Sequence, residues 1–547
     1  MKKYRDYFLI SLLGAMLFIP FLGRVHLFDW DEINFAESAR EMIVTNDFAQ
    51  VQINFQPFWE KPPLFMWMQA ASMKVFGVNE FAARFPNAII GIITLLVVFS
   101  IGKKLFDRRM GVLWAMTYAC TFLPAFYFRS GIIDPTFNLF IFLGVYFFTQ
   151  FISSKENQKQ KKSWQEITFS AFFIGLAVLT KGPVAMLVFA LCFLVYSIIN
   201  FKKIKIFLLQ YLWFAILLSA ISLIWILLVI STSGVATMKE FFDYQIRLLT
   251  TGDAGHSGFL FYHWVVLLVG CFPASLLLIY AFRKNKNLNA KQIIFKQWMQ
   301  ILFWVVLVLF TIVKTKIIHY SSLCWFPLTF LAAYVLWNQV FEKQKIHRAF
   351  TIALTGIGIL IGLILVAVPI VGQNINWIFR FANDQRTILA LQAKVSWNYF
   401  ECLIGIVFLV LFFYGLYFIV KKKDLLSGYF LLFVSSLITV QLVAVDFVPK
   451  VEKYSQGAVI EFYESLQGKD VYADADFYKS YAHLFYMKKP HQPNLNSYNM
   501  DWLRRGKIDK PAYFVIPSVY EKEFEQVNDA KLLFSKNGFS FYERLPE

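Results

Sequence analysis

The sequence predicts a multi-spanning α-helical membrane protein that carries a small domain outside the membrane. Of its 547 residues, 58% are hydrophobic and only 16% are charged. Soluble proteins average about 45–50% apolar and 25% charged residues. Apolar stretches of about 18 or more residues recur along the chain, and helices of that length satisfy their own backbone hydrogen bonds in lipid. The length and continuity of these stretches argue against a soluble fold and against an outer-membrane barrel.

The apolar stretches predict about thirteen transmembrane helices of roughly 20 residues each. The first is expected to be retained, because it is longer than the apolar part of a cleavable signal and no small-residue cleavage pattern clearly ends it. In chain order the expected spans cover residues 7–28, 84–105, 111–128, 134–152, 167–180, 183–200, 206–230, 259–282, 301–313, 317–340, 350–371, 399–420 and 425–445.

The positions of the lysines and arginines predict which helix ends face the cytoplasm. By the positive-inside rule, loops rich in these residues are cytoplasmic. The N-terminus is then inside, and an odd number of spans places the C-terminus outside. The net charge of +18 is therefore mainly a topology signal, which leaves nucleic-acid binding without its main support. The basic loops lie at residues 2–5, 103–109, 155–162, 202–205, 283–296, 343–348 and 421–423.

Two segments outside the membrane are long enough to be structured. In the first outer loop, residues 29–84, apolar residues from Ile33 to Ile43 share one helical face, which predicts a helix lying on the membrane surface. A second such stretch covers residues 64–75. After the transmembrane domain, residues 1–446, the composition changes. Residues 447–547 contain the alternating stretches KDVYADA and AYFVIP, which predict a small α/β domain.

Ionisable residues at the outer ends of the spans are the candidates for a functional site. Such groups at the bilayer usually face a bundle interior or a water-filled cavity. The alternative is that each cation reaches the lipid headgroups separately. The group comprises the acids Asp29, Asp31, Glu32, Glu60 and Asp134 and the cations Lys61, Arg129, Lys181, Arg247, Lys314 and Lys316.

The stretch FQPFWEKPPLFMWM places Glu60 and Lys61 before two prolines. Pro62 favours an extended conformation at Lys61, while Pro63 fits the first turn of a following helix. The ammonium group is thereby held at a helix start, where it could meet a phosphate, and Glu60 could orient a cation or bind a metal. The alternative is a turn between two surface helices with an incidental ion pair.

Asp31 stands at the start of the helix expected in the first outer loop. Aspartate in this position most often caps the helix. A carboxylate at the membrane surface could equally accept a proton from a hydroxyl, or orient a nucleophile that attacks a sugar carbon. The two roles are compatible.

Two further residues of the outer loops have both a functional and a structural interpretation. His256, in the stretch GDAGHSG, could bind phosphate, act as an acid or reach a metal, although a loop histidine without ligand-spaced partners is more often structural. Lys181 precedes Gly182 and Pro183, which suit a turn, and its amine could simply reach headgroups.

Six segments of the loops and helix ends stand out: DEINFAESAREM, FWEKPPLFMWM, GVNEFAARFPNAI, FRSGIIDPTF, LTKGPVA and KIIHYSSLCWFPL. Together they resemble the bacterial C-type (GT-C) glycosyltransferases of the dolichyl-phosphate-mannose protein mannosyltransferase superfamily, and within it most resemble the aminoarabinose lipid A transferases. The resemblance implies a GT-C fold in the bacterial inner membrane. It also implies transfer of a sugar from a polyprenyl phosphate to an acceptor on the outer face, with inversion. The chain has no glycine-rich nucleotide loop, in agreement with a lipid-linked donor.

Carried over by matching positions, the resemblance gives roles to individual residues. It places Asp31 as the catalytic acid and Asp134 as a second functional aspartate, and it makes a divalent metal at Glu60 a candidate cofactor. The donor phosphate is assigned to Lys61, Arg247, Lys316 and Tyr320. Apart from the resemblance, the positions of the charged residues and of the outer loops give supporting roles to Glu32, Glu60, Arg129, Lys181 and His256. Asn34 and Phe35 replace the Arg–Tyr pair common in these families, and Gln245 stands where a histidine is common.

The expected chemistry leaves the acceptor open. Breaking a sugar–phosphate bond builds negative charge on the leaving phosphate, which Lys61 and Arg247 would stabilise. With a hydroxyl acceptor, on protein or lipid, Asp31 would act as a base; with a phosphate of lipid A it would orient the nucleophile. A protein O-glycosyltransferase is therefore an alternative. A flippase for lipid-linked sugars, whose ionisable groups would lie near the bilayer midplane, or a glycan-binding scaffold is another.

Overall fold

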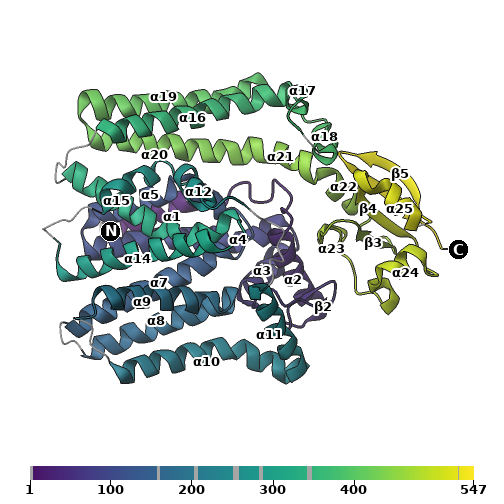
Figure 1. The fold of residues 1–547 in the computed structure, drawn as a ribbon, viewed down its shortest axis with the longest axis horizontal. Coiled ribbons are helices and arrows are strands. Elements are labelled where there is room, and N and C mark those ends of the chain that lie inside the picture. Colours follow the sequence, from purple (N-terminus) through teal and green to yellow (C-terminus); the bar gives the residue numbers. More distant parts are fainter. Residues whose placement is uncertain are drawn as a thin grey trace.

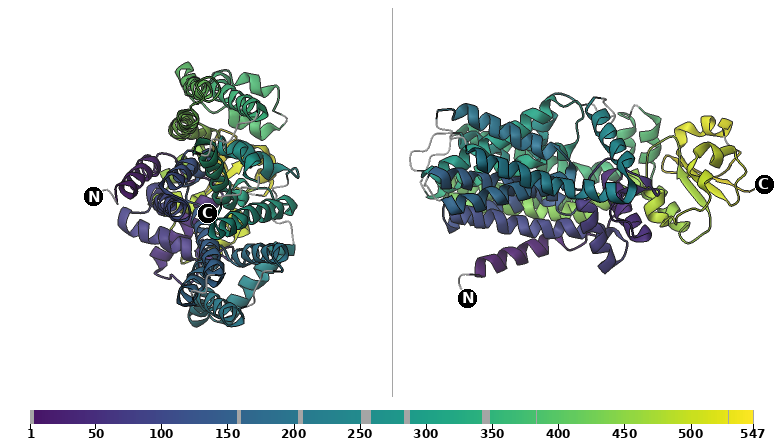
Figure 2. Two further views of the ribbon diagram at one scale, coloured as in Figure 1. Left: turned by 90° about the vertical axis from the view of Figure 1, so that its left-hand side faces the viewer. Right: turned by 90° about the horizontal axis from the view of Figure 1, so that it is seen from below.

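The computed structural model describes residues 4–156, 160–202, 207–250, 258–282, 288–341, 348–382, 384–527 and 529–546. Most of the chain forms a bundle of long helices that run side by side, and a small sheet domain lies at one end of the bundle (Figure 1). Helices α2 (Asp31–Thr45) and α3 (Leu64–Phe76) of the first outer loop lie between the two parts. The N-terminus lies toward the opposite end (Figure 2).

Most helices of the bundle follow one another through short connections, whereas α1 (Arg5–Phe18) and α4 (Glu80–Leu105) are joined by the long first outer loop. The other helices of the bundle are α5 (Arg108–Ala119), α6 (Phe122–Tyr127), α7 (Asp134–Glu156), α8 (Gln160–Lys181), α9 (Val184–Ile199), α10 (Leu208–Ser233), α11 (Val235–Thr250), α12 (Tyr262–Gly270), α13 (Ala274–Ala281), α14 (Ala290–Ile312), η1 (Ile318–Cys324), α15 (Trp325–Phe341), α16 (Arg348–Gln373), α17 (Asn376–Phe379), α18 (Gln385–Leu391), η2 (Tyr399–Glu401), α19 (Cys402–Tyr417), η3 (Phe418–Lys422), α20 (Leu425–Leu442), η4 (Val443–Phe447) and α21 (Val448–Ser455).

The chain is a multi-pass membrane protein. Within the described residues, eight helical stretches are long and apolar enough to cross a bilayer, or nine if the bent pair α12 and α13 counts as one span. The expected count of thirteen is not confirmed, since α1 has only 14 residues and α5 only 12. The first span was expected to continue to residue 28, but α1 ends at Phe18 and Phe21 has a φ of 63°.

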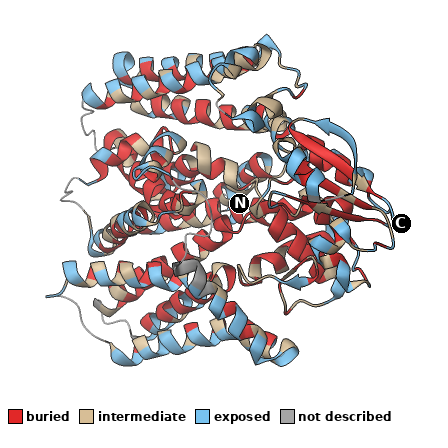
Figure 3. Ribbon diagram, turned by 45° about the vertical axis from the view of Figure 1, so that its right-hand side comes forward, coloured by how far each residue is buried: buried red, intermediate tan, exposed pale blue. Residues whose placement is uncertain are grey.

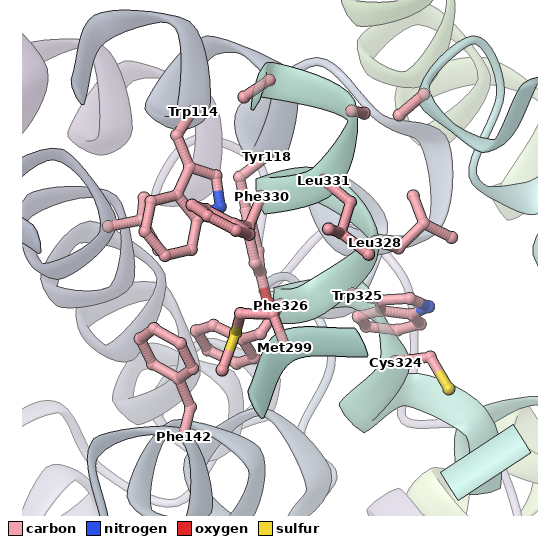
Figure 4. Close-up of a cluster of buried hydrophobic side chains, with 14 of the residues drawn as sticks. Trp114, Tyr118, Phe142, Met299, Cys324, Trp325, Phe326, Leu328, Phe330 and Leu331 are labelled. Carbon is pink, nitrogen blue, oxygen red and sulfur yellow. The ribbon is translucent and has the colours of Figure 1, made fainter. Parts of the chain in front are cut away.

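Burial separates the inner helix faces from the faces that lipid must cover. Helices at the edges of the bundle are largely exposed along their length (Figure 3). On α10, Leu209, Ile216 and Leu227 are 61–70% exposed. Apolar surface of this extent is stable only against lipid or another protein. In the interior, Trp114, Phe142, Phe326 and Phe330 pack in one cluster (Figure 4), in which the rings of Phe142 and Phe326 stack with centroids 4.4 Å apart.

The C-terminal part forms a four-stranded sheet with short helices, as the sequence predicted. Strand β3 pairs in parallel with β4, while β6 pairs antiparallel with both β4 and β5, giving the order β3-β4-β6-β5. The sheet begins after a helical run that extends unbroken from Leu425 to Ser455. The elements of the C-terminal part are α22 (Gly457–Ser465), β3 (Tyr472–Ala475), α23 (Ala482–Met487), η5 (Leu495–Tyr498), α24 (Met500–Arg505), β4 (Ala512–Pro517), η6 (Ser518–Tyr520), α25 (Glu521–Val527), β5 (Lys531–Lys536) and β6 (Phe539–Arg544).

Helix α2 is confirmed, but it does not lie on the membrane surface as its apolar face suggested. Every residue from Glu32 to Met42 is buried, the charged ones included. Its apolar side chains share a core with α3, α22, α23 and the sheet. Its polar face is covered as well, because Arg40 pairs with Glu37 at 2.6 Å and also donates to the backbone carbonyl of Lys489 in the C-terminal domain. The first outer loop also contains the two-residue strands β1 (Gln52–Ile53) and β2 (Gln56–Pro57).

Candidate active site

One large cavity of about 800 Å³ opens where the first outer loop, the bundle and the C-terminal domain meet. Nine of the residues proposed from the sequence line it: Asp29, Asp31, Glu32, Glu60, Lys61, Arg129, Asp134, Lys181 and Tyr320. Lys479 of the C-terminal domain also contributes to its wall. The structure therefore brings together proposed residues that lie as far as 291 positions apart in the sequence, from Asp29 to Tyr320.

A histidine lies between the two candidate aspartates. The Nε2 atom of His319, in η1, is 3.3 Å from Oδ2 of Asp31 and 3.9 Å from Oδ2 of Asp134. Asp31 is the first residue of α2, and its side chain does not cap the helix, since Trp30 is the N-cap residue. Its carboxylate is about 31% exposed toward the cavity and available for a ligand. This arrangement can pass a proton between a carboxylate and an imidazole.

Asp134 is paired with a lysine rather than left free. Nζ of Lys181 lies 2.6 Å from Oδ1 of Asp134, and both side chains are largely buried. Lys181 also lies 5.5 Å from the ring centroid of Tyr320. Lys181 ends α8, and Gly182, with a φ of +85°, provides the turn into α9 that the Gly-Pro sequence suggested. The pair fixes a cation and an acid at the wall of the cavity.

Glu60 and Lys61 form a second charged pair at the turn before α3. Pro63 is the N-cap residue of α3, so the two prolines place this pair immediately before the helix. Desolvation in the cavity lowers the pKa of Lys61, although Glu60 opposes this effect and Lys181 adds to it. Desolvation also raises the pKa of Glu60, against the influence of Lys61. Both groups are thus held where water is scarce and where charge–charge interactions are strong.

Glu32 supports the cavity wall and is not free to react. Its carboxylate accepts two hydrogen bonds from Arg84, at 3.0 and 2.7 Å, and one each from the backbone N–H groups of Phe28 and Gly131. Arg84 in turn donates to backbone carbonyls in the segment that precedes α2, including Leu22. Glu32 therefore ties the start of α2 to α4 and to the loop before Asp134.

The remaining proposed residues differ in where they lie. Arg129 donates to Oε1 of Gln441 at 2.9 Å and to the backbone carbonyl of Pro20, which holds it between α20 and the segment after α1. Lys316 does not line the cavity. Its amine donates to three backbone carbonyls, those of Phe310, Thr311 and Val313, at 2.7–2.9 Å. It thus binds the C-terminal end of α14, where the helix leaves carbonyls unpaired.

Two proposed residues fall outside what the structure describes. Arg247 belongs to α11, but its side chain is not among the described ones, and His256 lies in an undescribed stretch. Tyr244, one turn earlier on α11, lines the cavity. The metal at Glu60 stays a prediction. Within the described residues, the one group of three acids or histidines close enough to share a metal ion consists of His26, Glu80 and Glu464, and it does not include Glu60.

The sequence analysis missed several groups of the cavity, among them Arg84, His319 and Lys479. His319 stands inside the segment KIIHYSSLCWFPL, one residue before Tyr320, so the segment itself was the signal that could have found it. Lys479 comes from the C-terminal domain, and no local pattern distinguishes it from other exposed lysines. Its role follows only from the packing of that domain against the first outer loop.

Comparisons with known proteins agree with this geometry. The sequence model of the dolichyl-phosphate-mannose-protein mannosyltransferase family matches residues 60–225. An uncharacterized protein of Aquifex aeolicus (strain VF5) is 27% identical over 372 residues, which are 66% of this chain and 80% of that protein. The undecaprenyl phosphate-alpha-4-amino-4-deoxy-L-arabinose arabinosyl transferase of Edwardsiella ictaluri (strain 93-146) is 26% identical over 377 residues, which are 68% of this chain and 66% of the transferase. The match thus spans slightly less than two thirds of that transferase.

Two solved structures share the whole fold. The crystal structure of ArnT from Cupriavidus metallidurans in the apo state has a TM-score of 0.76 and 14% identity, covering 99% of this chain and 98% of that one. The same protein bound to undecaprenyl phosphate gives a TM-score of 0.72 and 16% identity over the same shares. The predicted resemblance to the C-type glycosyltransferases, and within them to the aminoarabinose transferases, is confirmed, and so is the fold.

Proposed function

We propose that the chain is a membrane glycosyltransferase that moves a sugar from a polyprenyl (undecaprenyl) phosphate to an acceptor on the outer face of the bacterial plasma membrane, with inversion. Lipid A or a related glycolipid is the acceptor. The observation that carries the proposal is the single cavity in which Asp31 and Asp134 meet Lys61 and Lys181. The relatives named as arabinosyl transferases and the ArnT structure with undecaprenyl phosphate support the same donor class.

The charges of the cavity suit the departure of a lipid phosphate. In the transfer, a nucleophile of the acceptor attacks the anomeric carbon while the bond from that carbon to the phosphate oxygen breaks. Negative charge grows on the phosphate, and the ammonium groups of Lys61 and Lys181 stabilise it. Attack from the face opposite the leaving group gives inversion. Arg247, on the same helix as Tyr244, is a further proposed phosphate contact.

The acids serve the acceptor side of the reaction. If the nucleophile is a hydroxyl, Asp31 takes its proton, and His319 lies within 3.3 Å to share it. If it is a phosphate of lipid A, no proton needs to leave, and Asp31 stabilises positive character at the anomeric carbon. The carboxylate of Asp134 stays paired with Lys181 and holds that cation in place.

The proposed orientation follows from the ends of the bundle. Arg108, in a basic loop, pairs with Asp6 at the N-terminal end of α1 at 2.6 Å. That end lies away from the C-terminal domain (Figure 2). The positive-inside rule assigns it to the cytoplasm, so the cavity and the C-terminal domain face outward.

The proposal is tested with the purified full chain in lipid nanodiscs. The protein is incubated with undecaprenyl-phospho-aminoarabinose and lipid A, and the lipid and protein fractions are analysed by mass spectrometry. Release of undecaprenyl phosphate together with sugar-modified lipid A is expected. Asp31→Asn is expected to abolish transfer, whereas the matched variant Asp501→Asn, at an exposed aspartate of the C-terminal domain, retains it. Sugar found only on protein would overturn the lipid A assignment, and no consumption of the donor would overturn the transferase.

A further inference from the structure

A second cavity of about 410 Å³ adjoins the active-site cavity on its outer side. Its walls come from residues 54–60 of the first outer loop, from Trp30 and Tyr244, and from residues 474–483 of the C-terminal domain. Trp30, Glu60, Tyr244 and Lys479 line both cavities. None of its lining residues belongs to a membrane-spanning helix. The cavity therefore lies beyond the membrane-spanning helices, where a headgroup is expected rather than a lipid tail.

Aromatic rings form much of this wall. The ring centroids of Trp30 and Tyr481 are 4.9 Å apart at an angle of 33°, and the ring of Phe58 meets that of Tyr481 edge-on at 6.4 Å. Trp59 adds another ring from the first outer loop. All four are only partly buried, so part of each ring remains exposed. One face of a pyranose carries mostly C–H groups, which pack on such rings while the polar edge of the sugar stays hydrogen-bonded.

Polar groups that can bind hydroxyls stand beside the rings. His483 is 3% exposed, and its Nε2 lies 3.6 Å from Oδ1 of Asp474. Among the residues that the structure describes, Nδ1 of His483 has no hydrogen-bond partner. A buried nitrogen without a partner is costly, and a ligand hydroxyl would satisfy it. Lys479 is exposed at the boundary of the two cavities, where it can meet a phosphate.

We propose that this second cavity, called the headgroup cavity, binds a sugar ring of the phosphorylated acceptor headgroup, with Asp474 and His483 as hydroxyl partners. The inference rests on the proposed function, because it concerns the acceptor of that reaction. A sugar ring that packs against the exposed part of the Trp30–Tyr481 pair lies next to Asp31, because Asp31 follows Trp30 in the chain. The acceptor nucleophile then reaches the active-site cavity across a shared wall, while the donor lipid keeps the membrane side.

Binding is measured first without turnover. Full-length protein in nanodiscs is titrated with the deacylated lipid A headgroup, a glucosamine disaccharide bisphosphate, while tryptophan fluorescence is recorded. Saturable quenching is expected. Asp474→Asn and Tyr481→Leu should each weaken binding roughly 10- to 100-fold, the range expected for a lost hydrogen bond to a charged group or a lost stacking ring. Asp470→Asn, at an 85%-exposed aspartate of the same domain, is the matched control and should bind like the wild type.

Steady-state kinetics then separate the acceptor from the donor sugar. Each variant should raise the KM for lipid A by the same factor by which it weakens headgroup binding. The KM for the donor should stay within two-fold of the wild-type value. The rate of the slow donor hydrolysis that occurs without acceptor should also stay within two-fold of the wild-type rate. A raised donor KM with an unchanged acceptor KM would show that the cavity takes the donor sugar and would overturn the inference, as would wild-type binding by both folded variants. Headgroup binding without any donor turnover would instead sink the proposed function and leave the headgroup cavity intact.

Discussion

Replacing Lys61 by methionine should slow sugar transfer far more than it changes the structure. Among the described residues that line the active-site cavity, five carboxylates face five cations, so the formal charge of the wall is balanced before a donor enters. Removing Lys61 leaves an excess negative charge in the cavity that is proposed to hold the lipid phosphate. The phosphate is then repelled in the ground state, and its growing charge loses a counterion in the transition state.

The size of the effect follows from the electrostatics of a partly desolvated cavity. Two unit charges about 4 Å apart interact by roughly 4 kcal/mol at an effective dielectric constant of 20. Loss of one preorganised group that stabilises developing charge typically costs about 2.7–4 kcal/mol, or 100- to 1,000-fold in kcat. Lys181 remains 2.6 Å from Asp134, and that pairing limits how far it can replace the lost charge. We therefore expect Lys61→Met to lower kcat by roughly 100-fold or more.

The assay compares Lys61→Met with Lys74→Met in nanodiscs, using release of undecaprenyl phosphate at saturating acceptor. Lys74 lies on α3 of the same outer loop but is exposed, with its amine 4.5 Å from the ring of Phe48. Both variants should show the thermal unfolding of the wild type, and Lys74→Met should also keep its kcat. A folded Lys61→Met protein that turns over within about three-fold of wild type would refute the electrostatic reasoning.

Three further predictions concern the groups that hold the cavity together. Glu32→Gln leaves the Arg84 guanidinium buried without its counter-charge and should cost about 3–5 kcal/mol, seen as a large fall in unfolding temperature; an unchanged value would contradict the role of this pair. Arg40→Met leaves the Glu37 carboxylate without its counter-charge in the interface with the C-terminal domain, and it should destabilise the protein to a similar extent. Arg380→Met, at an exposed arginine, should leave the unfolding temperature unchanged. Burial lowers the pKa of His483 to about 3. Below about pH 6.5 the unfolded chain therefore binds a proton at this histidine, whereas the folded chain does not. Stability should therefore fall as pH drops below about 6.5, by about 2 kcal/mol at pH 5, and His483→Gln should abolish that part of the pH dependence in urea titrations.

Local sequence signals predicted the elements of the site, but not how they are covered. The Pro62–Pro63 turn, the start of α2 at Asp31 and the strand AYFVIP follow from short-range preferences, and the structure has each of them. The burial of α2 does not follow from short-range preferences. Glu37 and Arg40 have the pattern of a solvated helix face, and the domain that covers them lies more than 400 residues away in the sequence. Lys316 does not line the cavity for a different and local reason, since the open carbonyls at the end of α14 bind its amine.

The buried charges around α2 also explain how the first outer loop can hold the proposed catalytic acid, Asp31, in a fixed position. Asp31 begins α2, and the very next residue is clamped by Arg84 and by the backbone of Gly131. Near the other end of the helix, Arg40 is bound both to Glu37 and to the C-terminal domain. Buried ion pairs add little net stability compared with apolar packing, but each demands one particular geometry, because any other leaves a charge unpaired. A helix held at both ends cannot slide, so the distance between Asp31 and His319 depends on residues other than the proposed reacting groups, among them the remote Arg40. Removing the Arg40 contacts should consequently reduce kcat while leaving the KM for the donor nearly unchanged. Unfolding of part of the sample cannot produce this result, because kcat is calculated for the folded fraction alone.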